Sequence, residues 1–457
     1  MPDLLGLEPT QLAGAYPDLT VGVAGLLRKL KRQEDEAGIL KYYELGQHIC
    51  DQFSWAKIPS QEPWGIPWID DNSNDYKLPH PCLFHAGWLI EDCPSENEES
   101  LQAEQKKLRE LIQTKFPAGS NPTDWYVLGA GDGDDMGKWL QGIKLKPYEN
   151  YVAKNYPDAN ARKNWEGVEA FLNTKKRMGG ATHAALSRAL LDFSNQLVPY
   201  LTERRYTGRL IYSGGDDVLA YTNLWEWDSW LWDIRQCFKG AQDDFYGEFK
   251  DEGGYWQWKS ADVPKDSTGR PLLASRPLFT MGEAATISFG MVIANQGVPL
   301  AIALENLWEA EAEAKEHFCT ALEEGKRKKD AVQVRVLYGN GNVLKATAKF
   351  AAFNQWRNLV AIPDLEPALF EQAAEIWKQH PIPVDSAISV WVQAFCARRD
   401  ALSKPEDAER FGNALRTFLE TLWETTDETD RDEEVSNWLK LAAFVLRKRE
   451  IKLGGQS

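Results

Sequence analysis

Short apolar runs in the middle of the chain predict β-strands. Trp125–Gly131 (WYVLGAG) and Thr286–Ile293 (TISFGMVI) are almost continuously apolar, which is typical of buried strands. Arg209–Ser213 and Val218–Tyr221 are shorter runs on either side of a glycine-rich segment, and together they predict a β-hairpin. Val332–Tyr338 alternates apolar and polar residues, as a strand with one buried face does.

Segments with helical periodicity separate these strands. An amphipathic helix is predicted over His183–Leu201, a Trp-rich helix over about Trp225–Phe238, and a third helix from Pro299 onward. With one extra helix set aside, we interpret the order of these elements as β-α-β-β-α-β. This order is typical of the ferredoxin-like fold, an antiparallel sheet with helices on one face, so the predicted fold class is α+β.

Three regions are expected along the chain. A turn cluster at Pro117–Pro122 marks the first boundary. Residues 1–120 are mixed and mainly helical, 121–345 hold the predicted sheet, and 346–457 form an all-helical domain. Helical spacing in the last region appears near Pro367–His380, Ser386–Leu402, Pro405–Thr425 and Glu433–Lys452.

Composition and charge narrow the function classes. The chain has 52 Lys and Arg against 68 Asp and Glu, a formal net charge of −16, which counts against a free-standing nucleic-acid binder. The six cysteines are scattered without a CxxC pair, which fits reduced thiols in a cytosol. No segment approaches a membrane span and the start lacks the pattern of a secretion signal, so we expect a cytoplasmic protein without membrane contact.

Two acidic clusters lie at predicted strand ends. Asp132, Asp134 and Asp135 follow the first strand, whereas Asp216 and Asp217 occupy the predicted hairpin turn. In a β-α-β-β order these strands are neighbours, so the clusters would meet at one edge of the sheet. Carboxylates this close raise one another's pKa, and a divalent cation removes the conflict. Magnesium prefers a few carboxylates with waters and phosphates, and two such ions can promote displacement at phosphorus.

The residues around the acidic clusters suit a nucleotide. Gly214 and Gly215 allow close approach to the backbone, and the amides of Met136 and Gly137 at a predicted helix start could hold phosphates. Lys138 would add a positive charge. GGDD alone is also compatible with an inert turn, because Asp and Gly are common turn residues. Turns on opposite sides of the molecule, or a lysine or arginine bridging them, would contradict the site.

Several ordered blocks resemble a known family. They are WYVLGAGDGDDMGKWL, HAALSRALLDF, GRLIYSGGDDVLAY, ATISFGMVIANQGVPL and EAEAKE, which together cover about residues 120–335. This series resembles the large polymerase-like subunit of type III CRISPR effector complexes in its Cmr (III-B) form. The resemblance implies a palm domain over 121–345 that joins ATP into cyclic oligoadenylate with two Mg²⁺ (or Mn²⁺) ions, as an antiviral signal, when the complex binds target RNA.

The resemblance also implies roles for individual residues. Asp132, Asp216 and Asp217 would be catalytic metal ligands, with Asp134 a weaker candidate. The implied nucleotide contacts are the Gly133 carbonyl, His183, Ser187, Ser213, Gly214, Gly215, Ser288 and Lys315, besides Met136, Gly137 and Lys138. His183 is equally compatible with ordinary helix-start hydrogen bonds, and Lys315 with a solvated helix position.

The chain also departs from the family. No HD nuclease motif, first palm or four-cysteine zinc site is found, so it looks like the C-terminal half of such a subunit. The expected partners are the other complex subunits, crRNA and target RNA, and a separate N-terminal half or a second copy that supplies the facing palm. His80, Cys82, His85 and Cys93 include zinc-binding residue types, but their spacing fits no strong template.

Two other functions stay open. The chain could be a non-catalytic scaffold that binds crRNA, target RNA and protein partners. It could also be a GGDEF-like cyclic dinucleotide synthase, although Val218 stands where the Phe region of that motif would begin.

Overall fold

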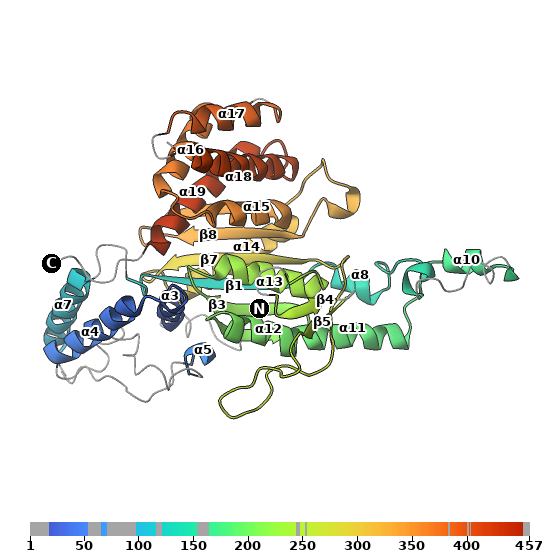
Figure 1. Cartoon of the computed structure of the whole chain (residues 1–457), viewed down its shortest axis with the longest axis horizontal. Helices are drawn as coiled ribbons and strands as arrows, with labels where there is room; N and C mark the ends of the chain where they lie inside the picture. The colour runs from blue at the N-terminus through green and yellow to red at the C-terminus, as the bar shows by residue number, and fades with distance from the viewer. Residues whose placement is uncertain are drawn as a thin grey trace.

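The computed structural model describes residues 18–53, 65–70, 97–115, 121–152, 164–243, 247–251, 254–382, 384–399, 402 and 404–450. A six-stranded sheet with the order β2-β3-β1-β7-β8-β9 lies at its centre (Figure 1). Its strands are β1 (Trp125–Gly133), β2 (Arg209–Gly214), β3 (Asp217–Thr222), β7 (Ile287–Asn295), β8 (Ala331–Leu337) and β9 (Val343–Lys349). The α+β fold class is confirmed.

The ferredoxin-like unit consists of β1, α11 (Gly180–Asp192), β2, β3, α13 (Trp227–Lys239) and β7. Strand β1 pairs antiparallel with both β3 and β7, and β2 pairs antiparallel with β3, which gives the sheet order of that fold. The predicted Trp-rich helix belongs to this unit. That helix, α13, is the second helix of the unit, because its buried Trp227, Trp230 and Ile234 pack on the sheet.

Helices cover both faces of the sheet, not one as predicted. On one face α11 and α13 pack on Val127, Val218 and Phe289. On the other face α14 (Leu300–Glu316) and α3 (Thr20–Arg32) pack on the side chains of β1 that alternate with Val127, which are Tyr126, Leu128 and Ala130. Because strand side chains alternate, each strand contributes to two separate hydrophobic cores.

The helix predicted over His183–Leu201 is longer and less regular than expected. After α11 the chain continues through the π-helical turn η4 (Phe193–Leu197), α12 (Val198–Tyr200) and a second π-helical turn η5 (Leu201–Arg205). Pro199 lies between the two π turns, where its missing N–H interrupts the regular hydrogen-bond series.

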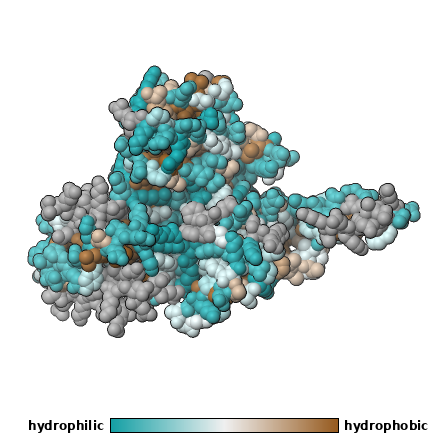
Figure 2. Space-filling model, viewed as in Figure 1, coloured by the Kyte–Doolittle hydropathy of each residue, from teal (hydrophilic) through white to brown (hydrophobic). Residues whose placement is uncertain are grey.

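Strands β8 and β9 extend the sheet toward the C-terminal helices. Strand β8 runs parallel to β7 and antiparallel to β9, so the whole sheet is mixed. The expected boundary at 345/346 falls within β9. The helices that follow lie beyond this edge (Figure 1): α15 (Phe350–Val360), α16 (Pro367–Gln379), α17 (Ala387–Cys396), α18 (Pro405–Glu424) and α19 (Arg431–Arg449). Apolar atoms gather over α17 in Figure 2, where Val390 is 66% exposed.

The remaining described elements surround the palm-like unit. The N-terminal helices are α3, α4 (Glu36–Gln52), α5 (Pro67–Asp70) and α7 (Glu98–Lys115), and an arm leads out through α8 (Met136–Leu140) to α10 (Val168–Leu172). A small sheet is built from β4 (Phe249–Asp251), β5 (Tyr255–Trp258) and β6 (Leu278–Phe279). In the described ranges, no helix has the length and apolar character needed to cross a membrane.

Alternate glycines on β1 allow large groups to contact its backbone. A Cβ on Gly129 would lie 2.7 Å from the Trp230 ring, and a Cβ on Gly131 would lie 2.4 Å from the Phe289 ring. Real Cβ atoms do not approach ring carbons this closely, so these positions accept only glycine without movement of the core. The same stripe continues to Gly133, at the acidic end of the strand.

We predict that Gly131→Ala destabilises the folded chain by about 1–3 kcal/mol, because the new methyl group overpacks the Phe289 contact. Thermal and urea unfolding would measure the loss. Gly137→Ala is the matched control: nothing lies within 4 Å of its added Cβ, and Gly137 is exposed within α8. An unfolding midpoint for Gly131→Ala equal to that of the control would contradict the packing argument.

Candidate active site

Backbone pairing brings the two acidic turns together. Gly131 of β1 is paired with Val218 of β3, so Asp132 and Gly133, which follow it, come level with Asp217 and Asp216. The β2–β3 hairpin closes with Gly214 opposite Asp217, which leaves Gly215 and Asp216 as the turn. Gly215 has φ +64°, a conformation that glycine adopts without strain. The turns thus lie at one end of the sheet, as predicted.

Glycine at position 133 permits the contact between the turns. A Cβ on Gly133 would lie 2.7 Å from the Cβ of Asp216 and 2.8 Å from its Oδ2. Asp216 therefore packs directly on the β1 backbone, and any other residue at 133 would push the turn away. The predicted contact of the Gly133 carbonyl with a nucleotide stays a prediction.

The carboxylates of the two turns raise one another's pKa. Burial and the neighbouring Asp132 raise the pKa of Asp216 to about 7 and that of Asp217 to about 6. Glu311 on α14 adds to the effect at Asp217, while Lys315 opposes it. This is the charge conflict expected of converging carboxylates that lack a compensating cation.

Lys315 lies among these carboxylates. Its ammonium contacts Asp132 and donates to Glu311 Oε1 at 2.7 Å, one helical turn earlier on α14. Ion pairs with Asp132 and Glu311 raise the pKa of Lys315 against the opposing effect of burial, so it stays charged at neutral pH. The bridging lysine that would count against a metal site is thus present at Asp132. Within the described part of the chain it forms no ion pair with Asp216 or Asp217.

The donor set still fits a divalent cation by charge. Asp132, Asp216, Asp217 and Glu311 supply four carboxylates against the single ammonium of Lys315, which leaves an excess of negative charge. Across the described ranges, no three His, Cys, Asp or Glu side chains converge as a ready metal-ligand cluster. Carboxylate oxygens are the ligands that magnesium prefers, and Lys315 would have to leave Asp132 for all three aspartates to serve.

Asp134 does not join this group. Ser288 Oγ donates to its Oδ1 at 2.9 Å, and the Asp330 N–H donates to its Oδ2 at 3.0 Å. Asp134 is 4% exposed and Ser288 is fully buried, and burial raises the pKa of Asp134. The predictions of Asp134 as a metal ligand and Ser288 as a nucleotide contact do not fit this placement, because their polar atoms are used within the protein interior.

Asp135 has a different environment that the sequence did not reveal. Its carboxylate accepts from Lys138 at 2.9 Å, Lys144 at 2.8 Å and Lys329 at 2.9 Å. These hydrogen bonds lower its pKa far below the ordinary range despite the opposing effect of partial burial. Asp135 also has φ +60°, a left-handed conformation immediately before α8. The predicted phosphate lysine, Lys138, is thus already paired.

The segment before β8 has a strained backbone and contacts the acidic end of β1. Lys329 and Asp330 both have positive φ values, +67° and +46°. Arg235 grips the Asp330 carboxylate with two hydrogen bonds of 2.8 and 2.7 Å, while Lys349 Nζ donates to the Lys329 carbonyl at 2.7 Å. Consecutive left-handed non-glycine residues are costly, and these surrounding hydrogen bonds offset the strain.

The other predicted nucleotide contacts are spread around the turns. His183 and Ser187 are exposed on α11. Ser213 donates to the Ser194 carbonyl at 2.6 Å, which ties the hairpin to η4. Gly137 is exposed at the start of α8, whereas Met136 packs partly on the core. These positions stay predictions, and the proposed zinc residues His80, Cys82, His85 and Cys93 lie outside the described residues.

Five residues that contact the acidic end of β1 or its supporting link were not predicted as parts of the site: Glu311, Lys144, Lys329, Asp330 and Arg235. For Glu311 a signal was available, since it stands four residues before Lys315 on a predicted helix, the spacing of an intrahelical ion pair. The others are brought to the turn only by tertiary structure. Lys329 lies just before β8, and in the structure it pairs with Asp135.

Comparison with known proteins agrees with this geometry. Residues 127–251 match the family model described as "Cas10/Cmr2, second palm domain". The match includes both acidic turns and α13 but ends before β7 and Lys315. A curated relative, the CRISPR system Cmr subunit Cmr2 of Pyrococcus furiosus, is 32% identical over 154 residues, or 33% of this chain and 16% of the relative.

Solved structures show the fold over more of the chain. The cryo-EM structure of type III-B Cmr-beta in its apo state matches with a TM-score of 0.50 and 14% identity, over 90% of this chain and 47% of that chain. A second Cmr-beta structure, bound to cognate target RNA, has a TM-score of 0.43 at 14% identity over 88% of this chain and 43% of that chain. The chain thus spans less than half the length of the relatives it matches.

The resemblance stated from the sequence is confirmed. Residues 127–251 are similar to the second palm domain of Cas10/Cmr2, and part of the chain is similar in sequence to the Cmr subunit Cmr2.

Proposed function

We propose that this palm is a nucleotidyltransferase that joins ATP into cyclic oligoadenylate during antiviral defence. The observation that carries the proposal is the convergence of Asp132 with Asp216 and Asp217 at one sheet edge, where burial and mutual repulsion raise two carboxyl pKa values. An inert turn gains nothing from such a charge conflict, whereas a cation-binding site depends on it.

The proposed reaction is nucleotidyl transfer at the α-phosphorus of ATP. The ribose 3′-oxygen of one nucleotide forms a bond to the α-phosphorus of the next ATP, the bond to pyrophosphate breaks, and the hydroxyl proton passes to solvent. Repetition lengthens the chain, and the same step between its ends closes the ring. Each ATP therefore releases one pyrophosphate.

Residues of this chain would divide the work. Asp132, Asp216 and Asp217 would hold Mg²⁺ or Mn²⁺, which when bound neutralises phosphate charge and activates a hydroxyl. The Gly214–Gly215 backbone would lie against the nucleotide. At Gly215 nothing lies within 4 Å of an added Cβ, whereas at Gly214 the Tyr212 hydroxyl lies 2.3 Å from that position. Lys315, released from Asp132, would pair with the triphosphate. The support for this role is that its ammonium already lies beside Asp132, one of the residues that would hold the cation.

The whole assembly is also part of the proposal. We infer that the chain acts with other type III complex subunits, crRNA and target RNA, and that another chain or a second copy supplies the facing palm. The support is the fold shared with Cmr-beta and the sequence match to Cmr2. Assays with and without these partners distinguish a self-sufficient enzyme from one that is completed by assembly.

A scaffold without catalysis is the second candidate. It is favoured by one observation: Lys315 pairs with Asp132, and in the described ranges the acidic residues are not gathered as a metal-ligand cluster. If the lysine pair is permanent, the turn carries charge for structure alone. The following experiments separate the two functions.

We expect the double variant D216A/D217A to lose ATP turnover by at least about a hundredfold, because both groups would contact the reacting centre through the cation. Pyrophosphate release and chromatography of the products, in the presence of Mg²⁺ and the partner subunits, measure the effect. The exposed Asp262, in a loop beyond β5, provides the control D262A, which should retain activity. Equal product formation by D216A/D217A with an unchanged melting curve would refute the catalytic role.

The raised pKa values predict a pH dependence of stability. The folded chain holds protons on Asp216 up to about pH 7 and on Asp217 up to about pH 6, whereas an unperturbed carboxyl loses its proton near 3.8. The folded state thus binds more protons between these limits, so metal-free stability falls as pH rises through that window. In D216N/D217N this part of the slope should disappear from melting temperatures measured in EDTA.

Metal binding should follow the opposite trend. Mg²⁺ competes with protons for the same oxygens, so added Mg²⁺ should raise the melting temperature more at pH 8 than at pH 5. The D216N/D217N variant should lose this response and D262N should keep it. An equal response in all three proteins would mean that the acidic turns do not hold the cation.

Lys315→Gln should separate the two roles of this lysine. Removing the ammonium frees Asp132 and Glu311, so we expect stronger stabilisation by Mg²⁺ together with a higher KM for ATP. Lys328→Gln, which breaks only the exposed pair with Glu316, is the matched control. A permanent structural pair predicts instead a lower melting temperature with no gain in metal response.

A further inference from the structure

A cavity of about 720 Å³ lies where the arm leaves the palm, apart from the acidic turns. Its walls come from the loop after α8, from α11, from the C-terminal end of α13 and from the segment after β6. Its lining includes Thr182, Ala185, Leu186 and Ala189, which share one face of α11, but not the predicted contacts His183 and Ser187. A cavity of this volume matches the size of a small-molecule site.

The charged residues of the cavity are mainly basic. Lys144, Lys146 and Lys239 line it against a single acidic residue, Glu283. In a chain with net charge −16 such a local excess of positive charge is unusual. It makes the cavity suited to an anion.

Two of these lysines lack an ion-pair partner in the described ranges. Lys144 is paired with Asp135 at 2.8 Å, but Lys146 and Lys239 form no ion pair with any part of the chain that the structure describes. Lys239 is half-buried, and burial together with the nearby Arg235 lowers its pKa. Asp330 and Glu283 oppose this shift without forming an ion pair with Lys239 in the described ranges. A partly desolvated ammonium that lacks an ion-pair partner is costly, and a bound phosphate would offset that cost.

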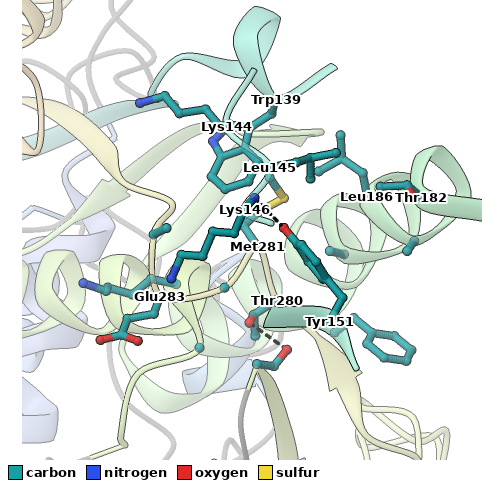
Figure 3. Close-up of a pocket in the computed structure, with 18 of the residues that line it drawn as sticks. Trp139, Lys144, Leu145, Lys146, Tyr151, Thr182, Leu186, Thr280, Met281 and Glu283 are labelled. Carbon is teal, nitrogen blue, oxygen red and sulfur yellow. Dashed lines mark hydrogen bonds between the residues drawn. The ribbon is translucent and has the colours of Figure 1, made fainter. Parts of the chain in front are cut away.

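The rest of the cavity is apolar and aromatic. Trp139, Leu186 and Met281 lie close together in Figure 3, on the side away from Glu283. Tyr151 accepts a hydrogen bond from the Lys146 amide at 3.1 Å, and the Lys146 side chain extends toward Glu283 in the same view. A flat ring can pack against such a wall, while the lysines reach the charged end of the same ligand.

We propose that this cavity binds a phosphate-bearing nucleotide, with Lys146 and Lys239 at its phosphates and Trp139, Leu186 and Met281 against its base. A free inorganic anion would use only the lysines and leave the apolar wall uncovered. The inference does not rest on the proposed catalysis, because none of the cavity's lining residues belongs to the two acidic turns.

The experiment measures binding of a fluorescent ATP analogue to the full chain in EDTA, so that no divalent cation supports binding at the acidic turns. We expect K146Q/K239Q to weaken binding by roughly tenfold or more, since two charge-assisted contacts are lost. K378Q, an exposed lysine of α16, should bind as the unmodified chain does. Competition with ATP, linear oligoadenylate and inorganic triphosphate identifies the source: triphosphate alone should compete least, since it lacks the base.

A second pair of variants tests the cavity without altering its charge. Ala185 lines the cavity and Ala184 does not, although both are exposed on α11. A185W should block binding, and A184W should not. D216A/D217A should bind normally in EDTA.

Three outcomes would overturn the proposal. They are full binding by both K146Q/K239Q and A185W, loss of binding in D216A/D217A, and tighter binding of a single-stranded RNA than of any nucleotide at this cavity. The second outcome would place the nucleotide at the acidic turns and leave the proposed function standing. Absence of ATP turnover with intact cavity binding would overturn the proposed function alone.

Discussion

The site depends on the close approach of two backbone segments at the end of β1. Strand pairing fixes the register of β1 against β3, and Gly133 has no side chain to hold Asp216 away. Once this register is set, the carboxylates must share a small volume, because neither turn can retreat without breaking the sheet. The raised pKa values of Asp216 and Asp217 are the electrostatic consequence of a geometry that the hydrophobic core enforces. The core thus supplies the free energy that holds like charges together.

The structure opposes this repulsion with several cations, each of which acts on a different carboxylate. Lys315 is directed to Asp132, and three other lysines gather at Asp135. Asp216 and Asp217 keep their charge conflict, while the adjacent Asp135 is fully compensated. This division supports the proposal that Asp216 and Asp217 hold a cation, whereas Asp135 fixes the end of β1 through its lysine pairs. The strained Lys329–Asp330 link serves the same purpose, since its amide binds the buried Asp134.

Local patterns predicted those features that depend on neighbouring positions in sequence or on standard topology. The strands, most helices and the meeting of the acidic turns follow from apolar period and β-α-β-β order. The same patterns failed wherever a role depends on which element packs on which. The prediction of helices on one face of the sheet failed because the apolar patterns of α13 and α14 do not reveal which face each helix covers. Asp134 and Asp132 are both acidic and two residues apart, yet Ser288 and the Asp330 amide bind only Asp134.

Asp135 connects the acidic turns with the basic cavity. Its backbone follows the last residues of β1, and its carboxylate pairs with Lys144, which lines the cavity. Any shift of the β1 end therefore changes how much of the Lys144 charge reaches a ligand in the cavity. Conversely, a phosphate near Lys144 would compete with Asp135 for that ammonium and loosen one of the three contacts that hold the turn. The two sites have opposite charge and separate lining residues, and the Asp135–Lys144 ion pair is the contact that lies between them.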